Sequence, residues 1–201
     1  MSDQQGLVIW LTGMSGTGKT TLAQALAQAL PARGAARMQL LDGDELRQTL
    51  CRGLGFSRAD RDENIQRLGY VAQLLERHGV AVIVAAISPY RETRAAVQAT
   101  LTRCLEVQCT APLTVLQQRD VKGLYAQAAA GELPQFTGVS DPYEPATAPA
   151  VTVDSSAETV AAGVDKVLAA LTARGWLAGD AGLTTAEEEL VRQRLADLGY
   201  L

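Results

Sequence analysis

The stretch GMSGTGKTT, residues 13–21, decides the fold of this chain. It fits the pattern G-x-x-x-x-G-K-[ST], in which a glycine-rich turn joins a strand to a helix. The glycines let backbone N–H groups curl around phosphate oxygens, and the helix N-terminus adds the positive end of its dipole. We expect Lys19 to reach the outer phosphates and Thr20 to offer its hydroxyl to Mg²⁺. The stretch therefore predicts a binding site for a nucleoside triphosphate.

The residues on either side predict alternating strands and helices. Short apolar runs, which are typical of buried strands, occupy 7–13, 36–42, 79–87, 103–109 and 150–155. Helical patterns lie between and after them, over 19–30, 45–50, 58–78, 91–101, 113–119 and 157–175. This alternation predicts an α/β fold of the P-loop NTPase type, a doubly wound parallel sheet with helices on both faces.

Two segments depart from the alternation. Residues 121–149 are rich in Gly, Pro and Ala, and a long irregular segment inside a compact domain is typical of a functional lid or of disorder. A further helical pattern with its own cap signal ends the chain. We therefore expect one P-loop domain over 1–177, with a lid at about 121–149, and a C-terminal helical tail over 178–201.

Composition and charge argue against several classes of protein. The 201 residues carry a net charge of −4, whereas a general nucleic-acid binder would normally be basic. No apolar run approaches the roughly 20 residues needed to span a bilayer, and the N-terminus lacks the regions of a signal peptide. We therefore expect a cytoplasmic protein without a membrane partner. The three cysteines have no CxxC spacing, so they predict neither a disulfide framework nor a zinc site.

Polar residues follow two of the expected strands. Asp42 and Asp44 end the second strand, and Ser88 and Arg91 follow the third. In open α/β sheets the ligand crevice lies beyond the carboxyl ends of the strands. Two acids there could orient a hydroxyl nucleophile or support Mg²⁺. The alternatives are that the acids only start a helix and that Ser88 belongs to a plain strand-to-helix turn.

The charged stretch RADRDENIQR, residues 58–67, divides between two faces of an expected helix that begins after Ser57. At about 100° per residue, Arg61 and Asn64 share the inward face with the apolar stripe. The residues expected to face solvent are Asp62, Glu63 and Gln66. Burying an arginine is costly without an anionic partner. With Phe56 just before the helix, the inward pair would suit an anionic nucleotide whose base stacks on the ring.

The residues narrow the class of P-loop protein. The base-reading sequence N-K-x-D of GTPases is absent, and an oligomeric ATPase would usually be larger. A short chain with an irregular lid favours a kinase, which must exclude water while it transfers the γ-phosphoryl group.

Six motifs together resemble the adenylylsulfate (APS) kinase family. They are GMSGTGKTT, DGDELR, LGFSRADRDENIQR, ISPYRETR, RDVKGLY and GELPQFTGVSDPYE, in the order and spacing of that family over about 7–177. The resemblance implies transfer of the ATP γ-phosphate to the 3′-hydroxyl of adenosine 5′-phosphosulfate (APS) in sulfate activation. The products would be ADP and 3′-phosphoadenosine 5′-phosphosulfate (PAPS).

The resemblance also implies site residues, with ATP and Mg²⁺ as cofactors and the metal at Thr20 and Asp44. The catalytic set would be Lys19, Asp44 and Ser88. Asp44 would orient or deprotonate the 3′-hydroxyl, and Ser88 would contact substrate without acting as a nucleophile. The residues expected at ATP are Gly13, Ser15, Gly16, Gly18, Lys19, Thr20, Thr21 and Arg119. Those expected at APS are Asp42, Arg47, Phe56, Arg61, Asn64, Ile87, Ser88, Lys122, Phe136 and Thr137, with the two phenylalanines stacking on the adenine.

Three departures from the family pattern leave alternatives open. The lid is poor in positive charge, Glu45 stands where Asn is common, and the chain ends differ from those of relatives. The depleted lid would suit a kinase for another hydroxylated anionic metabolite. A non-catalytic module that senses APS or PAPS is a second alternative, although intact Lys19, Thr20 and Asp44 argue against it. We expect a homo-oligomer, and a link to an ATP sulfurylase within a larger sulfate-activating protein stays open.

Overall fold

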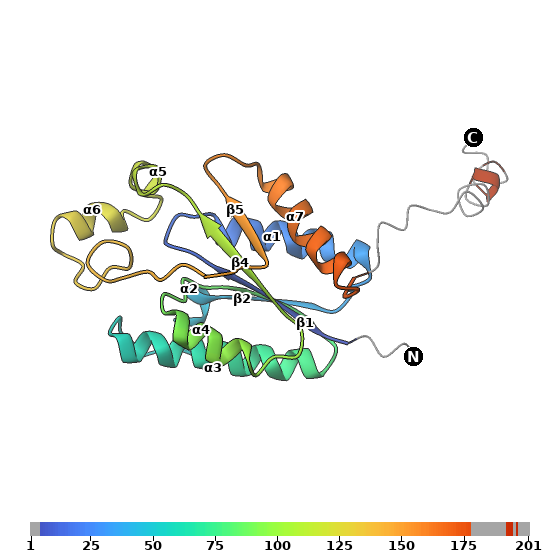
Figure 1. Ribbon diagram of the computed structural model, residues 1–201, viewed down its shortest axis with the longest axis horizontal. Helices are drawn as coiled ribbons and strands as arrows, with labels where there is room; N and C mark the ends of the chain where they lie inside the picture. The colour runs from blue at the N-terminus through green and yellow to red at the C-terminus, as the bar shows by residue number, and fades with distance from the viewer. Residues whose placement is uncertain (1–4, 178–191, 195, 197–201) are drawn as a thin grey trace.

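The protein is a five-stranded parallel sheet with helices on both faces, as predicted (Figure 1). The computed structural model describes the chain except for residues 1–4, 178–191, 195 and 197–201. The strands, in the order β2-β3-β1-β4-β5, are β1 Leu7–Thr12, β2 Met38–Asp42, β3 Ala81–Ala85, β4 Cys104–Thr110 and β5 Val151–Asp154. The predicted tail over 178–201 falls largely outside the described residues.

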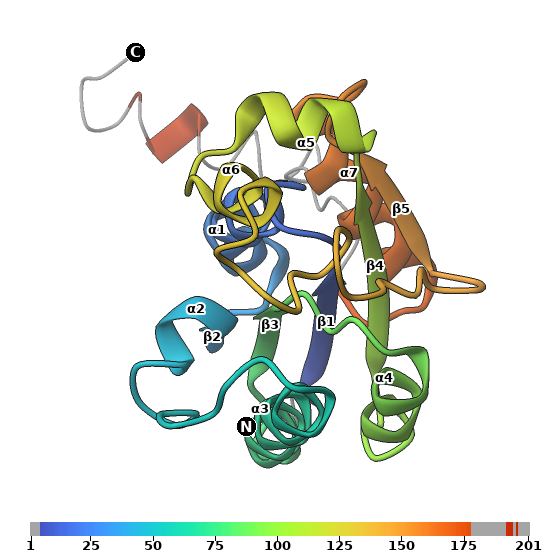
Figure 2. The ribbon, with the colours of Figure 1, turned by 90° about the vertical axis from the view of Figure 1, so that its left-hand side faces the viewer.

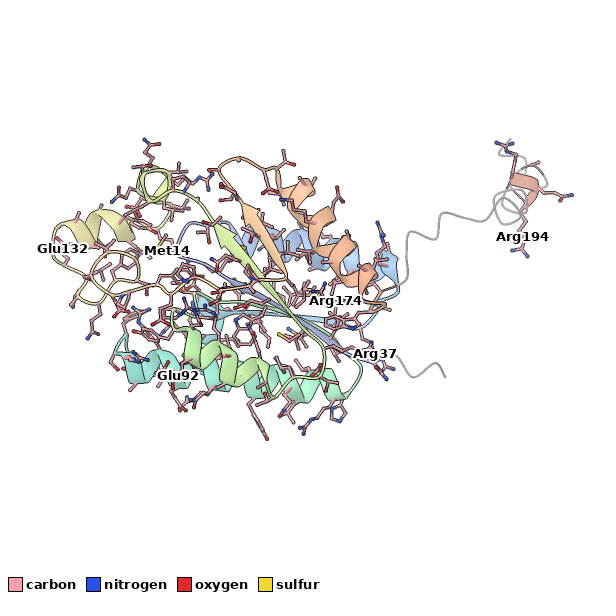
Figure 3. The ribbon with its side chains drawn as sticks, in the orientation of Figure 1. Met14, Arg37, Glu92, Glu132, Arg174 and Arg194 are labelled. Atoms are coloured by element: carbon pink, nitrogen blue, oxygen red, sulfur yellow. The ribbon has the colours of Figure 1, made fainter. Side chains whose placement is uncertain are left out.

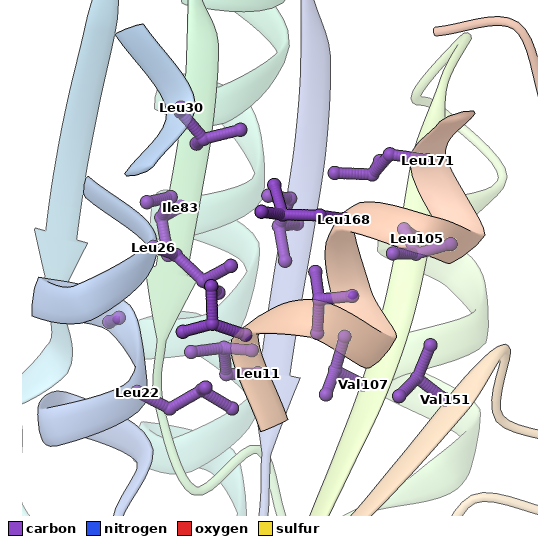
Figure 4. Packing of buried hydrophobic residues seen from close by; sticks show 14 of the residues in the cluster. Leu11, Leu22, Leu26, Leu30, Ile83, Leu105, Val107, Val151, Leu168 and Leu171 are labelled. Atoms are coloured by element: carbon purple, nitrogen blue, oxygen red, sulfur yellow. The ribbon is translucent and has the colours of Figure 1, made fainter. Parts of the chain in front are cut away.

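The central strand β1 is buried along its whole length, which explains its uninterrupted apolar sequence. Its alternate side chains enter two different cores. Leu7, Ile9 and Leu11 pack under helices α1 Lys19–Ala29 and α7 Val160–Ala173, the side shown in Figure 4. Val8 and Trp10 pack under helices α3 Arg58–Arg77 and α4 Arg91–Gln98. The sheet is therefore held by one apolar layer on each face.

The remaining helices are short, and they show where the sequence prediction differs from the structure. They are η1 Leu30–Arg33, α2 Gly43–Leu46, α5 Leu113–Arg119 and α6 Leu124–Ala129. The helix expected over 45–50 is shorter and runs over Gly43–Leu46. It begins earlier because the Asp42 carboxylate caps it by accepting from Asp44 N at 2.9 Å. Helix α6 lies inside the segment predicted to be irregular. It forms because the Asp120 carboxylate accepts from two backbone N–H groups of its first turn, each at 3.0 Å.

The sheet order brings the strand ends that carry the candidate residues to one edge. Strand β1 pairs with β3 on one side and β4 on the other, so the glycine-rich turn after β1 lies at the middle of that edge. Figure 2 looks onto this edge and shows the loop after α6 crossing in front of the sheet, with α5 and α6 above it. Within the described residues, no helix is long and apolar enough to cross a membrane.

Helices α3 and α4 touch at Gly69, where an added Cβ would lie 2.3 Å from Val97 Cγ1. We predict that Gly69→Ala lowers the free energy of unfolding by about 2 kcal/mol. Overpacking at this distance costs about 3 kcal/mol, and the better helix propensity of Ala returns about 1 kcal/mol. Urea unfolding measures the difference. Adding Val97→Ala should recover part of the loss, and Gln66→Ala on the exposed side of α3 serves as control. Equal or higher stability of Gly69→Ala would contradict this packing.

Candidate active site

A cavity of about 720 Å³ lies at the carboxyl edge of the sheet, within the usual size range for small-molecule sites. The P-loop, α2, α3, the turn after β3 and the lid all contribute to its wall. Gly13 does not line it, but the other predicted site residues do: Ser15, Gly16, Gly18, Lys19, Thr20, Thr21, Asp42, Asp44, Arg47, Phe56, Arg61, Asn64, Ile87, Ser88, Arg119, Lys122, Phe136 and Thr137. The fold thus collects residues from six separate motifs around one space.

Gly13 lies beneath the P-loop, against β4. A Cβ at this position would lie 2.3 Å from the carbonyl oxygen of Cys109, so no other residue fits without moving the backbone. Gly18 begins α1 with a φ of 81°, which glycine adopts without strain. The close approach at Gly13 and the turn at Gly18 together shape the loop that the sequence predicts for phosphate.

Lys19 turns back over this loop. Its Nζ donates to the carbonyl oxygens of Gly13 and Met14, each at 2.9 Å. Burial lowers the pKa of Lys19 to about 8, an effect that the nearby carboxylates of Asp44 and Asp42 partly oppose. An anion in the loop would favour the charged form of this lysine.

The two acids after β2 have different partners. Asp42 caps α2, as the alternative expected, and it also accepts a hydrogen bond from the Thr20 hydroxyl at 2.8 Å. Its place in the site stays a prediction. Asp44 forms an ion pair across the cavity with Lys122 of the lid. Among the described residues, no three or more His, Cys, Asp or Glu gather into a metal site. A hydroxyl beside carboxylates does fit Mg²⁺, which typically takes one or two carboxylates together with water and phosphate oxygens.

Arg61 and Asn64 lie on the inward face of α3, as predicted, with exposures of 5% and 6%. The sequence prediction gave Arg61 an anionic ligand as its partner. In the structure, anionic and polar groups of the chain itself contact Arg61. Its Nε donates to Phe56 O at 2.8 Å and lies 3.7 Å from Asp141 Oδ2, and its Nη2 donates to Gln135 O. The lid therefore contacts this guanidinium directly.

One residue predicted to face solvent is only partly exposed. Asp62 accepts a hydrogen bond from Thr93 on α4, because the two helices pack closely along this side. Arg91, expected at the crevice edge, does not line the cavity. It is exposed, and its guanidinium donates to Pro145 O at 3.1 Å. Both positions depend on how α3, α4 and the end of the lid pack together.

Phe56 forms a platform with two arginines at the cavity wall. Its ring is 54% exposed, and the guanidinium carbons of Arg47 and Arg61 lie 4.6 Å and 5.5 Å from its centroid. Burial, with a smaller contribution from Arg61, lowers the pKa of Arg47. An aromatic face beside two cations suits a ligand that combines a base with an anionic group.

Two buried polar atoms of the cavity wall have no hydrogen-bond partner within the described structure. They are Asn64 Oδ1 and Thr137 Oγ1, one on α3 and one in the lid. A buried polar group left unpaired costs about 1–3 kcal/mol, so a polar ligand in the cavity would be stabilised by pairing with either atom. Neither could be identified from the sequence as unpaired.

Ser88 is held in an uncommon backbone conformation, with a φ of 47°. It is 2% exposed, and its hydroxyl accepts from Trp10 Nε1 at 3.1 Å. Within the described residues the hydroxyl bonds only to Trp10 and to the carbonyl oxygen of Ala86, and neither is a base that could activate it. This geometry favours a contact role over a nucleophilic one.

The lid packs onto the P-loop through residues that the sequence prediction missed. Tyr125 on α6 donates to Ser15 O at 2.9 Å, and its ring meets Phe136 edge-to-face at 5.0 Å between centroids. Met14 of the P-loop lies against the lid (Figure 3), and its sulfur would be 2.4 Å from a Cβ at Gly138. Tyr125 could have been singled out in the sequence because it is an aromatic residue in an Ala-rich segment.

Arg119 ends α5, just before the lid begins, and it lines both the cavity and a neighbouring cavity of about 220 Å³. Its guanidinium donates to the hydroxyl and the carbonyl oxygen of Ser155, at 2.9 Å and 2.7 Å. The contacts join the end of α5 to the loop after β5, on the P-loop side of the site.

Comparison with known proteins agrees with this geometry. Residues 5–154 match the family model for adenylylsulphate kinase. An adenylyl-sulfate kinase of Chloroflexus aurantiacus is 58% identical over 168 residues, covering 84% of this chain and 90% of that protein. One of Myxococcus xanthus is 52% identical over 181 residues, covering 88% of this chain and 97% of that protein.

Solved structures are similar as well. A Mycobacterium tuberculosis APS kinase in complex with AMPPNP and APS has a TM-score of 0.79 and 39% identity, with 84% of this chain and 98% of that chain covered. A hexameric APS kinase from Thiobacillus denitrificans has a TM-score of 0.66 and 32% identity, with 87% of this chain and 30% of that chain covered. The protein therefore belongs to the adenylylsulphate kinase family.

Proposed function

We propose that this protein transfers the γ-phosphate of ATP to the 3′-hydroxyl of APS, releasing PAPS and ADP. One observation carries the proposal: a single cavity joins the P-loop residues Lys19 and Thr20 to the buried polar face of Arg61 and Asn64. A phosphate donor and an anionic nucleotide acceptor could therefore meet in it.

The donor side is formed by the P-loop. Triphosphate oxygens would replace the two carbonyl oxygens as partners of Lys19, and the N–H groups at the start of α1 would face the same oxygens. Thr20 and Asp42, already joined by a hydrogen bond, would hold Mg²⁺ together with phosphate oxygens, and Asp44 is the further metal candidate. The ion, when bound, neutralises charge on the phosphates.

The acceptor side is formed by α2, α3 and the lid. The cations of Arg47 and Arg61 would hold the phosphosulfate, and Phe56 and Phe136 would contact the adenine. The unpaired oxygen atoms of the cavity wall would meet polar groups of the nucleotide. Asp44 would orient the 3′-hydroxyl or accept its proton, with Lys122 holding the carboxylate in place.

The lid would exclude water during transfer, because its contacts cover the P-loop directly. The hydrogen bond from Tyr125 to Ser15 and the packing of Tyr125 on Phe136 tie the two together. Water in the site would compete with the 3′-hydroxyl for the phosphoryl group, so closure favours transfer over hydrolysis.

A non-catalytic APS- or PAPS-sensing module is the second candidate. The presence of Lys19, Thr20 and Asp44 on one cavity wall favours catalysis over it. The hexameric relative supports a homo-oligomer for this chain too. A cytoplasmic location and a link to an ATP sulfurylase stay predictions.

The decisive experiment measures ADP release from MgATP with and without APS. We predict release that depends on APS, with PAPS formed in equal amount. APS binding without APS-dependent release would favour the sensing module. Release with another hydroxylated anion in place of APS would assign a different acceptor.

Asp44→Ala should reduce kcat by about 10²–10⁴-fold, the usual contribution of a positioned general base, and change the KM for APS little. Glu45→Ala is the matched control, because this exposed neighbouring acid does not line the cavity. Steady-state kinetics of both variants give the comparison. A rise in KM for APS with unchanged kcat would show that the orienting role of Asp44 is wrong.

ATP binding should weaken at alkaline pH. In the free protein Lys19 loses its proton as the pH rises through about 8, whereas bound phosphate favours the protonated form. The Kd for ATP should therefore be nearly constant below pH 7.5 and rise by up to about tenfold per pH unit above pH 8. Titration calorimetry from pH 7 to 9.5 tests this. Lys19→Arg, which stays charged, should bind more weakly but with a flat profile, and a flat wild-type profile would contradict the prediction.

A further inference from the structure

Arg94 on α4 is a buried cation that none of the predicted roles uses. It is 1% exposed and does not line the cavity. A buried guanidinium needs its donors satisfied, so its partners show what it holds together.

The three nitrogens of Arg94 contact three separate segments. Nη1 donates to Ser88 O at 2.6 Å, Nη2 donates to Glu144 O at 2.7 Å, and Nε pairs with Glu106 Oε1 on β4 at 3.1 Å. One planar group thus joins the turn after β3, the C-terminal end of the lid and the sheet. A planar fork of donors suits this task, whereas an ammonium presents a single point of charge.

The contact with Ser88 acts on the cavity wall. Ser88 lines the cavity with its left-handed φ of 47°, a conformation that persists only where its surroundings impose it. Arg94 holds its carbonyl oxygen, while Trp10 holds its hydroxyl at 3.1 Å. Arg94 therefore helps to impose the backbone direction at this wall.

The contact with Glu144 acts on the lid. Residues 143–145, here called the lid base, are tied to the same turn at several points. Glu144 N donates to Pro89 O at 2.9 Å, and Glu144 Oε2 accepts from Arg91 N at 2.8 Å. Just before the lid base, Asp141 accepts from Tyr90 at 2.8 Å and lies 3.7 Å from Arg61. The position of the lid base thus affects how the lid meets Arg61.

We propose that Arg94 is a positioning residue for the acceptor side of the site: it joins the Ser88 turn and the lid base into one unit and so sets the geometry in which the acceptor nucleotide is held. The proposal rests on the proposed function for the identity of that nucleotide, APS. It predicts a selective effect, because within the described part of the chain Arg94 forms no hydrogen bond or ion pair with the P-loop residues 13–21.

The test separates positioning from folding. Removing Arg94 alone would leave the Glu106 carboxylate without its partner, so the variant of choice is Arg94→Met/Glu106→Gln, which removes both charges. Calorimetry measures the Kd of APS and of ATP, and kinetics measure both KM values. Two hydrogen bonds to carbonyl oxygens are lost, so we expect APS binding to weaken by about tenfold or more, with ATP binding within about twofold of wild type.

Arg91→Met is the matched control. Arg91 also holds the lid base, through Pro145 O at 3.1 Å, but its side chain does not contact Ser88. We expect its APS affinity to stay within about twofold of wild type. An equal loss of APS affinity in this control would mean that anchoring of the lid base alone suffices, and the proposal would be wrong. Equal weakening of APS and ATP in the double variant, or no weakening, would also overturn it.

Two outcomes are read separately. If the double variant does not fold, Arg94→Lys replaces it, because a lysine keeps the charge beside Glu106 but cannot span both carbonyl oxygens. The same selective loss of APS affinity is then required. If wild-type protein binds APS but releases no ADP with it, the proposed function fails, while the APS affinities of the variants still decide the role of Arg94.

Discussion

The close approach of Gly13 to the carbonyl oxygen of Cys109 is the constraint on which the site depends. A Cβ at Gly13 would lie 2.3 Å from that oxygen, so the turn after β1 can only pass β4 with glycine at this position. The turn then carries the chain into α1 with Lys19 folded over the loop and Thr20 facing Asp42 at 2.8 Å. The contacts between the P-loop and the second strand follow from this path of the backbone.

Charge pairs join the lid to the α2 and α3 sides of the site. Lys122 of the lid pairs with Asp44, and Asp141 of the lid lies 3.7 Å from Arg61. In the free protein, groups assigned to ligands therefore already have partners within the chain. Lys122 is the only basic residue of 121–149, and this single cation of the lid pairs with Asp44. Under the proposed function, ligand binding would exchange these partners, which would let lid position and site occupancy influence each other.

Most of the fold could be predicted from local patterns. Short apolar runs marked the strands, and the 3.6-residue period placed Arg61 and Asn64 on the inward face of α3, where they are buried. The features that these patterns did not reveal have a common cause. Helix α6 depends on a cap by Asp120. The contact of Asp62 with Thr93 and the partners of Arg94 depend on residues distant in the sequence. Patterns that extend over a few neighbouring residues do not contain this information. The unpaired oxygen of Asn64 is likewise a property of its surroundings.

By itself, the sequence determined that the chain forms a parallel sheet with a P-loop and that certain charged residues face inward, because glycine placement and hydrophobic period act over a few neighbouring residues. The tertiary structure alone decided which of these residues share a cavity, which carboxylate meets which cation, and where the lid is attached. These depend on packing between distant segments: Arg94 on helix α4 and Glu144 in the lid are fifty positions apart, and their contact exists only after the fold has brought the helix and the lid together.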